Sequence, residues 1–144
     1  MQTITEYLSA EHRHCDDLFA EAEAAAAKND LAAAQAGFTA FHQGMEHHLS
    51  KEETIMFPAF EQVTGSSMGP TTVMRMEHEQ MRELFAEMQA ALDAKDTSTY
   101  AGLSETLLVL MQQHNFKEEQ MLYQMADRTL GDREDIIRQM EALP

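Results

Sequence analysis

The stretch His48-Leu-Ser-Lys-Glu52-Glu53 places a histidine and a glutamate four residues apart. Residues at this spacing lie on one face of a helix about one turn apart, so both side chains can reach one metal ion. The pattern returns in His114-Asn-Phe-Lys-Glu118-Glu119, at an offset of 114 − 48 = 66 residues. A histidine paired with a hard carboxylate suits iron, zinc or manganese better than calcium or copper(I). The two stretches are therefore predicted to be the halves of one dinuclear metal site.

The matching stretches belong to a longer internal repeat that runs at the same offset of 66 residues without a gap. Each half has the order Glu-His, turn, His-x-x-x-Glu-Glu, which indicates one helical hairpin per half. A hairpin cannot bury its apolar faces alone, so the two halves are expected to pack together. The aligned residues are Glu11, His12, His48, Glu52 and Glu53 in the first half and Glu77, His78, His114, Glu118 and Glu119 in the second.

The two histidines of each half lie about equally far from a predicted turn, which is near Asn29 and Asp30 in the first half and near Lys95 and Asp96 in the second. In an antiparallel hairpin such residues share one level, roughly 27 Å from the turn at about 1.5 Å per residue. Six ligands exceed the four of a structural zinc site. They suit two metals bridged by the two glutamates, with positions left open for a small ligand. The predicted metal ligands are His12, His48, Glu52, His78, His114 and Glu118.

The length and composition favour a single all-α domain. The 144 residues fit one domain, predicted to span 1–144. Ala, Leu, Met, Glu and Gln dominate, and these are strong helix formers. No stretch shows the period-2 alternation of a strand. Long amphipathic helices joined by short links predict an antiparallel up-down-up-down four-helix bundle, followed by a short C-terminal fifth helix.

Capping and breaking residues set the expected helix ends. Thr3 and Glu6 read as a capping box that opens the first helix, which ends near Ala27. Pro58 is predicted to kink or end the second helix. The other expected segments are a second helix from Leu31, a loop at Gly65–Pro70, a third helix from about Pro70, a fourth from about Tyr100 to Arg128 and a fifth from Arg133 to Ala142.

The charge and cysteine content exclude several classes of function. The net charge of −15 argues against binding to nucleic acid or to anionic membrane surfaces, since both need basic patches. Cys15 is the only cysteine, so a reducing compartment is the simplest inference. The start of the chain lacks the features of a signal peptide, and no apolar run reaches transmembrane length. A cytoplasmic protein that binds neither nucleic acid nor membrane is predicted.

Several residues beside the predicted ligands have two interpretations. Glu11 and Glu77 precede ligand histidines and either orient them or lie at the surface, whereas Glu53 and Glu119 are alternatives to the neighbouring glutamates as ligands. Asp16 lies one turn after His12, and it is expected outside the ligand set because its repeat counterpart is Arg82. The residues expected off the ligand face or in the core are His14, His42, His47, Cys15, Tyr7 and Tyr123.

On these residues the sequence resembles the hemerythrin-like family of HHE cation-binding domains. The resemblance covers about Thr5 to Arg128. It implies a four-helix bundle around two iron ions that are bridged by carboxylates, with an oxo or hydroxo bridge as an option. Family activities are reversible dioxygen binding, oxygen or redox sensing, and handling of iron or nitric oxide. The matching motifs are Glu11-His12, His48-x-x-x-Glu52-Glu53 followed by Met56-Phe57-Pro58, Glu77-His78 and His114-x-x-x-Glu118-Glu119.

The ligand pattern departs from that of the dioxygen-carrying hemerythrins. Their third helix supplies two histidines four residues apart, whereas here the partner of His78 is Arg82. Their last ligand is an aspartate, whereas here Glu118 takes that place. The four-histidine, two-glutamate set is more similar to that of the di-iron proteins that repair iron–sulfur clusters after nitrosative stress.

Three functions follow as hypotheses. The first is a non-haem di-iron protein that binds or reacts with dioxygen or nitric oxide for sensing, storage or stress protection; a sensor would need a protein partner. The second is a di-iron enzyme that oxidises ferrous iron or reduces peroxide, or a protein that aids iron–sulfur repair. The third is a helical interaction module without metal, which the symmetric ligand pattern disfavours. The sequence does not decide between the first two, so whether the protein is an enzyme stays open.

Overall fold

Capping residues start the helices as the sequence predicts. The Thr3 hydroxyl accepts a hydrogen bond from the Glu6 N–H, and the Glu6 carboxylate accepts one from the Thr3 N–H. Asp30, Asp96 and Asp132 cap later helices by accepting from the backbone N–H three residues on. A side-chain cap of this kind contributes about 0.5–2 kcal/mol to stability. Because Asp96 is such a cap, the helix expected from about Tyr100 begins three residues earlier.

A computed structural model describes residues 2–66 and 68–144. Every regular element in these two ranges is helical, which confirms the all-α prediction. None of the helices described there is long and apolar enough to cross a membrane. The α-helices are α1 (Ile4–Ala27), α2 (Leu31–Lys51), α3 (Phe57–Thr64), α4 (Pro70–Asp93), α5 (Thr97–Lys117), α6 (Tyr123–Thr129) and α7 (Arg133–Glu141), and two π-helical turns are η1 (Glu52–Met56) and η2 (Glu118–Leu122).

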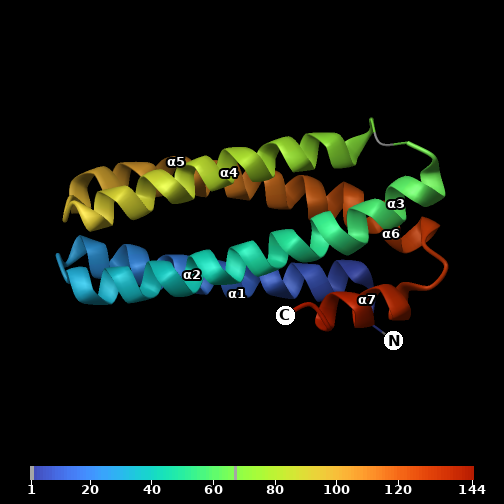
Figure 1. Ribbon diagram of the computed structural model, residues 1–144, viewed down its shortest axis with the longest axis horizontal. Helices are drawn as coiled ribbons and strands as arrows, with labels where there is room; N and C mark the ends of the chain where they lie inside the picture. Colours follow the sequence, from blue (N-terminus) through green and yellow to red (C-terminus); the bar gives the residue numbers. More distant parts are fainter. Residues whose placement is uncertain (1, 67) are drawn as a thin grey trace.

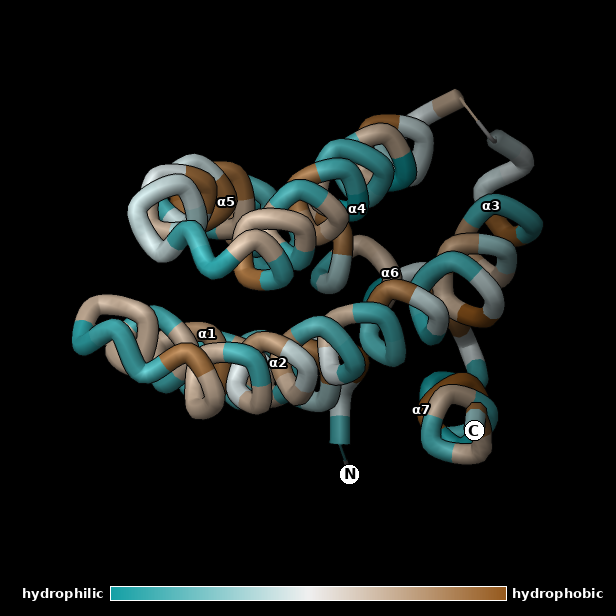
Figure 2. Tube along the Cα trace, turned by 60° about the vertical axis from the view of Figure 1, so that its left-hand side comes forward, coloured by the Kyte–Doolittle hydropathy of each residue, from teal (hydrophilic) through white to brown (hydrophobic). Residues whose placement is uncertain are grey.

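The helices form two hairpins that pack on each other. Figure 1 shows α1 beside α2 and α4 beside α5, with the two helices of each hairpin running in opposite directions. The first hairpin contacts the second through α1 with α5 and through α2 with α4. The helix α7 lies outside the two hairpins (Figure 2) and contacts η1 and α1. The bundle is therefore built from one helical hairpin placed against another.

The 66-residue repeat is present in the backbone. The bounds of α4, α5 and η2 equal those of α1, α2 and η1 with 66 added to each number. The turns match as well, since Asn29 and Lys95 have φ angles of 56° and 59°, in the left-handed region. The two halves therefore share one backbone course. A difference between matched positions is then a difference in side-chain chemistry rather than in fold.

One π-helical turn interrupts the second helix of each hairpin. Pro58 was predicted to kink or end the helix, and an end at Pro58 is wrong, because the chain continues as α3 to Thr64. Nor does the proline cause the π turn just before it, because η2 forms in the second half, where the matched residue is Gln124. The turns begin instead at the matched residues Glu52 and Glu118. Such π turns are rare and occur frequently at functional sites.

Two clusters of buried apolar side chains lie along the bundle. One includes Phe38, Phe41 and Phe85, and the other includes Leu8 and Met56. Fully burying a side chain of this size contributes roughly 1.5–3 kcal/mol. The residues that separate the clusters along each helix are the predicted histidine and glutamate ligands. The polar layer is therefore supported by apolar packing on both sides.

Candidate metal centre

Six polar side chains are buried together between the two apolar clusters. Each of the four long helices α1, α2, α4 and α5 supplies one histidine, and each π turn supplies its first residue, a glutamate. Such side chains are rarely buried completely unless they are paired or bind a metal. The exposed fractions are 3% for His12, 2% for His48, 0% for His78, 1% for His114 and 0% for both Glu52 and Glu118.

The six residues form two overlapping groups, within each of which ligand atoms lie within 4.8 Å of one another and could hold a metal ion. Each group contains the two histidines of one hairpin, and Glu118 belongs to both. The structure thus brings together every side chain that the sequence nominated as a ligand. The first group is His12, His48 and Glu118, and the second is Glu52, His78, His114 and Glu118.

Buried atoms without hydrogen-bond partners test whether the residues fit a metal. In the described part of the chain, three histidine Nε2 atoms, Glu52 Oε1 and Glu118 Oε2 have none. His78 Nε2 lies 3.2 Å from Glu52 Oε1 without making a hydrogen bond. Each unsatisfied buried group costs about 1–3 kcal/mol, so ligand atoms gathered in this way indicate a group that binds among them. Imidazole nitrogens with carboxylate oxygens suit iron, zinc or manganese, and the residues therefore fit a metal centre.

Within each hairpin, a carboxylate holds the outer nitrogen of one histidine. His48 Nδ1 lies 2.9 Å from Glu11, and His114 Nδ1 lies 2.8 Å from Glu77. A carboxylate at this position fixes the Nδ1–H tautomer and directs Nε2 toward a metal. Of the two interpretations that the sequence leaves for Glu11 and Glu77, the structure supports the orienting one.

Glu53 and Glu119, which follow Glu52 and Glu118, each contact the outer nitrogen of a histidine in the opposite hairpin. His78 Nδ1 lies 2.7 Å from Glu53, and His12 Nδ1 lies 2.7 Å from Glu119. The two contacts exchange carboxylates between the hairpins and therefore tie the halves together at the level of the site. Glu53 and Glu119 contact the outer side of the histidines and belong to neither group that could hold a metal.

In each hairpin, a lysine also donates a hydrogen bond to the carboxylate that contacts the histidine. Lys51 donates to Glu11 and, over 2.7 Å, to the Tyr7 hydroxyl, while Lys117 donates to Glu77. Burial raises the pKa of Glu11, but the hydrogen bonds from His48 and Lys51 outweigh burial and lower it to about 2. Glu11 is thereby kept ionised, as is required to accept the Nδ1 proton of His48.

In the metal-free protein the facing carboxylates favour the protonated forms of His12 and His78. Burial lowers the pKa of His12 and of His78, but the facing carboxylates outweigh it and raise the values to about 10 and about 11. Burial and repulsion by Glu118 raise the pKa of Glu52. Burial acts in the same direction on Glu118, but His114 and other histidines hold the pKa of that carboxyl well below its ordinary value. Binding of a cation must therefore displace protons from this centre.

Tyr123 also contacts the centre, although the sequence placed it simply in the core. Its buried hydroxyl donates to Glu52 Oε2 over 2.6 Å. The same oxygen lies 2.9 Å from Glu118 Oε1 and 3.1 Å from His12 Nε2. A phenol is thus in hydrogen-bond reach of three of the six nominated side chains.

The repeat partner of Tyr123 is Phe57, which keeps the ring and lacks the hydroxyl. Phe57 stacks on His78 with ring centres 5.5 Å apart, and Tyr123 stacks on His12 with ring centres 5.6 Å apart. Comparing the position five residues after each central glutamate would have exposed this difference from the sequence alone.

The remaining polar candidates lie off the centre. His14 and Asp16 are exposed. His47 Nε2 donates to a backbone carbonyl near the C-terminus over 3.0 Å, and His42 packs against two phenylalanine rings. Cys15 is buried, and burial raises the pKa of its thiol to about 12, which fits a core residue. None of these five belongs to a group that could hold a metal within the described part of the chain.

Comparison with known proteins gives one family. Residues 3–126 match the family described as Hemerythrin HHE cation binding domain. One similar curated protein is the Iron-sulfur cluster repair protein YtfE of Edwardsiella ictaluri, which is 35% identical over 100 residues, or 62% of this chain and 43% of that protein. The protein of the same name from Enterobacter sp. is 34% identical over 98 residues, or 61% and 44%. The chain spans less than half the length of these relatives, and no solved structure matches it significantly.

Proposed function

The chain belongs to the hemerythrin HHE cation-binding domain family, and we propose that it is a non-haem di-iron protein that binds or reacts with small molecules such as dioxygen or nitric oxide. One observation carries the proposal: buried nitrogen and oxygen ligand atoms gather in two overlapping groups, and five of these atoms lack hydrogen-bond partners among the described residues. Sensing, storage and protection against stress are the roles that such chemistry suits.

The proposed ligands divide between the hairpins. His12 and His48 would hold one iron, and His78, His114 and Glu52 would hold the other. Glu118 belongs to both groups and would be shared between them. Bound iron supplies redox chemistry and open coordination positions for a small molecule.

The surrounding residues of this chain prepare the site. The outer carboxylates hold the Nδ1 protons and keep each Nε2 directed inward. The apolar clusters on both sides of the layer limit the access of water. The Tyr123 hydroxyl oxygen lies 2.6 Å from Glu52 Oε2 and donates its proton to it, so a change of charge on Glu52 would act on this hydrogen bond.

Metal analysis tests the proposal. After anaerobic loading with ferrous iron, we expect two iron ions per chain, one for each group of ligands. Stopped-flow spectra of the loaded protein under dioxygen, nitric oxide and peroxide then separate reversible binding from turnover. A reproducible content near one metal per chain, or selective binding of zinc, would contradict the proposal.

A second candidate is a role in iron–sulfur cluster repair. It is favoured by the relatives in Edwardsiella and Enterobacter, which carry that function in their names. The test is reactivation of an enzyme whose iron–sulfur cluster has been damaged, with the loaded protein as the added component. A Glu118→Ala variant is the control, because it keeps the fold-forming apolar clusters and removes a residue common to both groups. Equal reactivation by the two proteins would exclude this role.

A further inference from the structure

Because of the repeat, the four buried histidines can be approached from solvent at two equivalent places. The side chains that line these two places differ. One approach lies between α1 and η2, where Glu119 contacts His12; we call it the Glu119 side. The other lies between α4 and η1, where Glu53 contacts His78; we call it the Glu53 side. Among the residues that differ between them at an offset of 66 are Ser9 and Asp16 on the Glu119 side, which match Arg75 and Arg82 on the Glu53 side.

On the Glu53 side, Arg82 holds the outer carboxylate. Its Nη1 and Nη2 atoms donate to the two oxygens of Glu53, each over 2.9 Å, and its Nε donates to Glu46 over 3.0 Å. A bidentate pair of this kind is among the strongest side-chain hydrogen bonds and fixes the geometry of the carboxylate. Glu53 is therefore engaged by His78 and Arg82 together and has no free oxygen for another cation.

Arg75 covers the same approach further out. Its guanidinium carbon lies 5.3 Å from the centre of the Phe57 ring, and it donates to Glu61 over 3.2 Å. Since Phe57 stacks on His78, the arginine lies over the ring that lies over the histidine. Two arginines that are ion-paired with carboxylates thus cover the Glu53 side and leave those carboxylates engaged.

On the Glu119 side, both arginines are replaced. The position of Arg82 is taken by Asp16, which is exposed and cannot donate to a carboxylate. Among the residues that the structure describes, the hydrogen bonds and ion pairs of the Glu119 carboxylate are with His12 alone. Its side chain is 32% exposed, compared with 23% for Glu53. Glu119 therefore keeps an oxygen available to a ligand that arrives from solvent.

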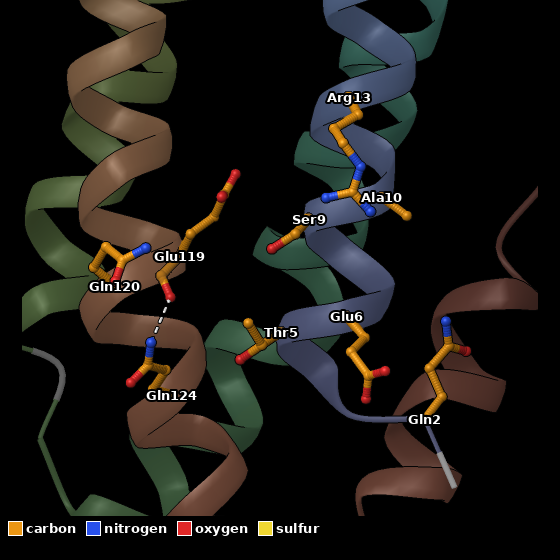
Figure 3. A pocket seen from close by; sticks show the side chains of 9 residues that line it. All are labelled: Gln2, Thr5, Glu6, Ser9, Ala10, Arg13, Glu119, Gln120 and Gln124. Atoms are coloured by element: carbon orange, nitrogen blue, oxygen red, sulfur yellow. Dashed lines mark hydrogen bonds between the residues drawn. The ribbon is translucent and has the colours of Figure 1, made fainter.

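The position of Arg75 is taken by Ser9, and a pocket of about 530 Å³ opens there between α1 and the helix of η2 and α6. Ser9 is 7% exposed, and its hydroxyl is buried without a hydrogen-bond partner in the described chain. Figure 3 shows this hydroxyl directed into the gap between α1 and the helix that carries Glu119. Glu6 also lines the pocket, and the basic lining residue is Arg13, whose side chain is exposed. A buried, unpartnered hydroxyl beside a carboxylate with a free oxygen suits a small hydrated cation.

We propose that divalent metal enters and leaves the centre through this pocket on the Glu119 side, with Glu119 as its temporary ligand, and that Arg75 and Arg82 close the Glu53 side. The proposal rests on the proposed di-iron function. The Glu119 carboxylate lies 2.7 Å from His12 Nδ1, so an ion held there is next to a member of the first ligand group. The net charge of −15 draws cations toward the surface, and the outer carboxylate that no arginine engages is on the Glu119 side.

The test transplants the arginines to the other side. Asp16→Arg copies Arg82, and adding Ser9→Arg copies Arg75. Ferrous ion is added anaerobically to the metal-free protein, and its release from the loaded protein to excess ferrozine is followed separately. We expect both rates to fall at least about tenfold in the double variant, with a smaller fall for Asp16→Arg alone, while the metal content at equilibrium is unchanged.

A matched control separates the effect of the position of the new arginine from the effect of the change in net charge. Asp17→Arg makes the same change of charge on the neighbouring exposed residue, and its rates should stay within about twofold of the parent protein. Asp16 is itself exposed, so Asp16→Arg carries the test if the double variant fails to fold. Parent-like rates in Asp16→Arg, or equal slowing in Asp17→Arg, would overturn the proposed route. Failure of the parent protein to bind two metals would instead overturn the di-iron function, so the two failures are distinct.

Discussion

The two halves of the bundle share one backbone course, whereas most of their matched side chains differ outside the buried centre. Both halves keep the inward histidines and glutamates, the outer carboxylates and the lysines at Lys51 and Lys117. They differ in the ring after each π turn, Phe57 against Tyr123, and in the groups that flank the outer carboxylates. The residues around the centre that repeat are those proposed to hold or orient a metal. The residues that differ there set how exposed Glu53 and Glu119 are, and they place a hydroxyl beside Glu52 at Tyr123 but none at Phe57.

The largest expected effect is the loss of bound metal when Glu52 or Glu118 is replaced. Glu118 belongs to both candidate groups, whereas Glu52 belongs to one. Glu118→Ala should therefore lose both metal ions, and Glu52→Ala should lose mainly the ion of the second hairpin. Metal analysis after anaerobic loading and desalting measures the difference.

An equal loss in the two variants would show that the metal-bound centre restores the symmetry that the metal-free side chains lack. His14→Ala serves as the control, because His14 is exposed and lies off the site. A loss of metal in His14→Ala together with full metal content in His12→Ala would show that the repeat has been aligned at the wrong histidine.

The next effect concerns the outer carboxylates that cross between the hairpins. Replacing an orienting carboxylate typically costs about 10–100-fold in metal affinity. We expect Glu53→Gln to fall in the upper part of that range, because it also leaves Arg82 without its bidentate partner. Glu119→Gln should cost less, since the described structure shows only His12 bound to that carboxylate. Competition with a chromophoric chelator measures both affinities, and the reverse order would contradict the assigned difference between the sides.

How much the sequence could predict depends on whether a feature repeats. The six buried side chains were nominated correctly as neighbours, because the offset of 66 residues and the helical period together place them at one level. The π turns were missed, since Pro58 drew attention to one half and no residue in the second half signals η2. The Tyr123 hydroxyl was missed because a tyrosine in a helix most simply reads as core. The pairing of Glu53 and Glu119 with opposite hairpins depends on packing between halves, which no pattern within one half encodes.

The free energy of unfolding should depend on pH more strongly in the metal-free protein than in the loaded protein. The pKa of His12 is raised to about 10 and that of His78 to about 11, above about 6.5 in the unfolded chain. Their protonation therefore stabilises the metal-free fold fully below about pH 6.5, and this contribution is lost as the pH rises toward the folded pKa values. In the loaded protein the same nitrogens would bind metal and have no proton to lose.

We expect the free energy of unfolding of the metal-free protein to fall by at least about 1–2 kcal/mol between pH 7 and pH 9. The loaded protein should lose less over that range. Denaturant unfolding of both forms at matched ionic strength measures this. A parallel decline in the two forms would show that groups outside the metal centre dominate the titration.

The smallest expected effect isolates the one hydroxyl that breaks the symmetry of the centre. Tyr123→Phe copies Phe57, keeps the ring that stacks on His12 and leaves Glu52 Oε2 buried without its donor. The metal-free variant should lose about 1 kcal/mol of stability, the cost of one buried hydrogen bond. Once metal is bound, Glu52 would gain a cation as partner, so the loss should shrink in the loaded protein. Phe57→Tyr is the reciprocal control, because it adds a hydroxyl on the half that lacks one. If Tyr123→Phe destabilised the loaded protein more than the metal-free one, the phenol would belong to the metal-bound centre itself, and the two halves would differ in ligands as well as in surroundings.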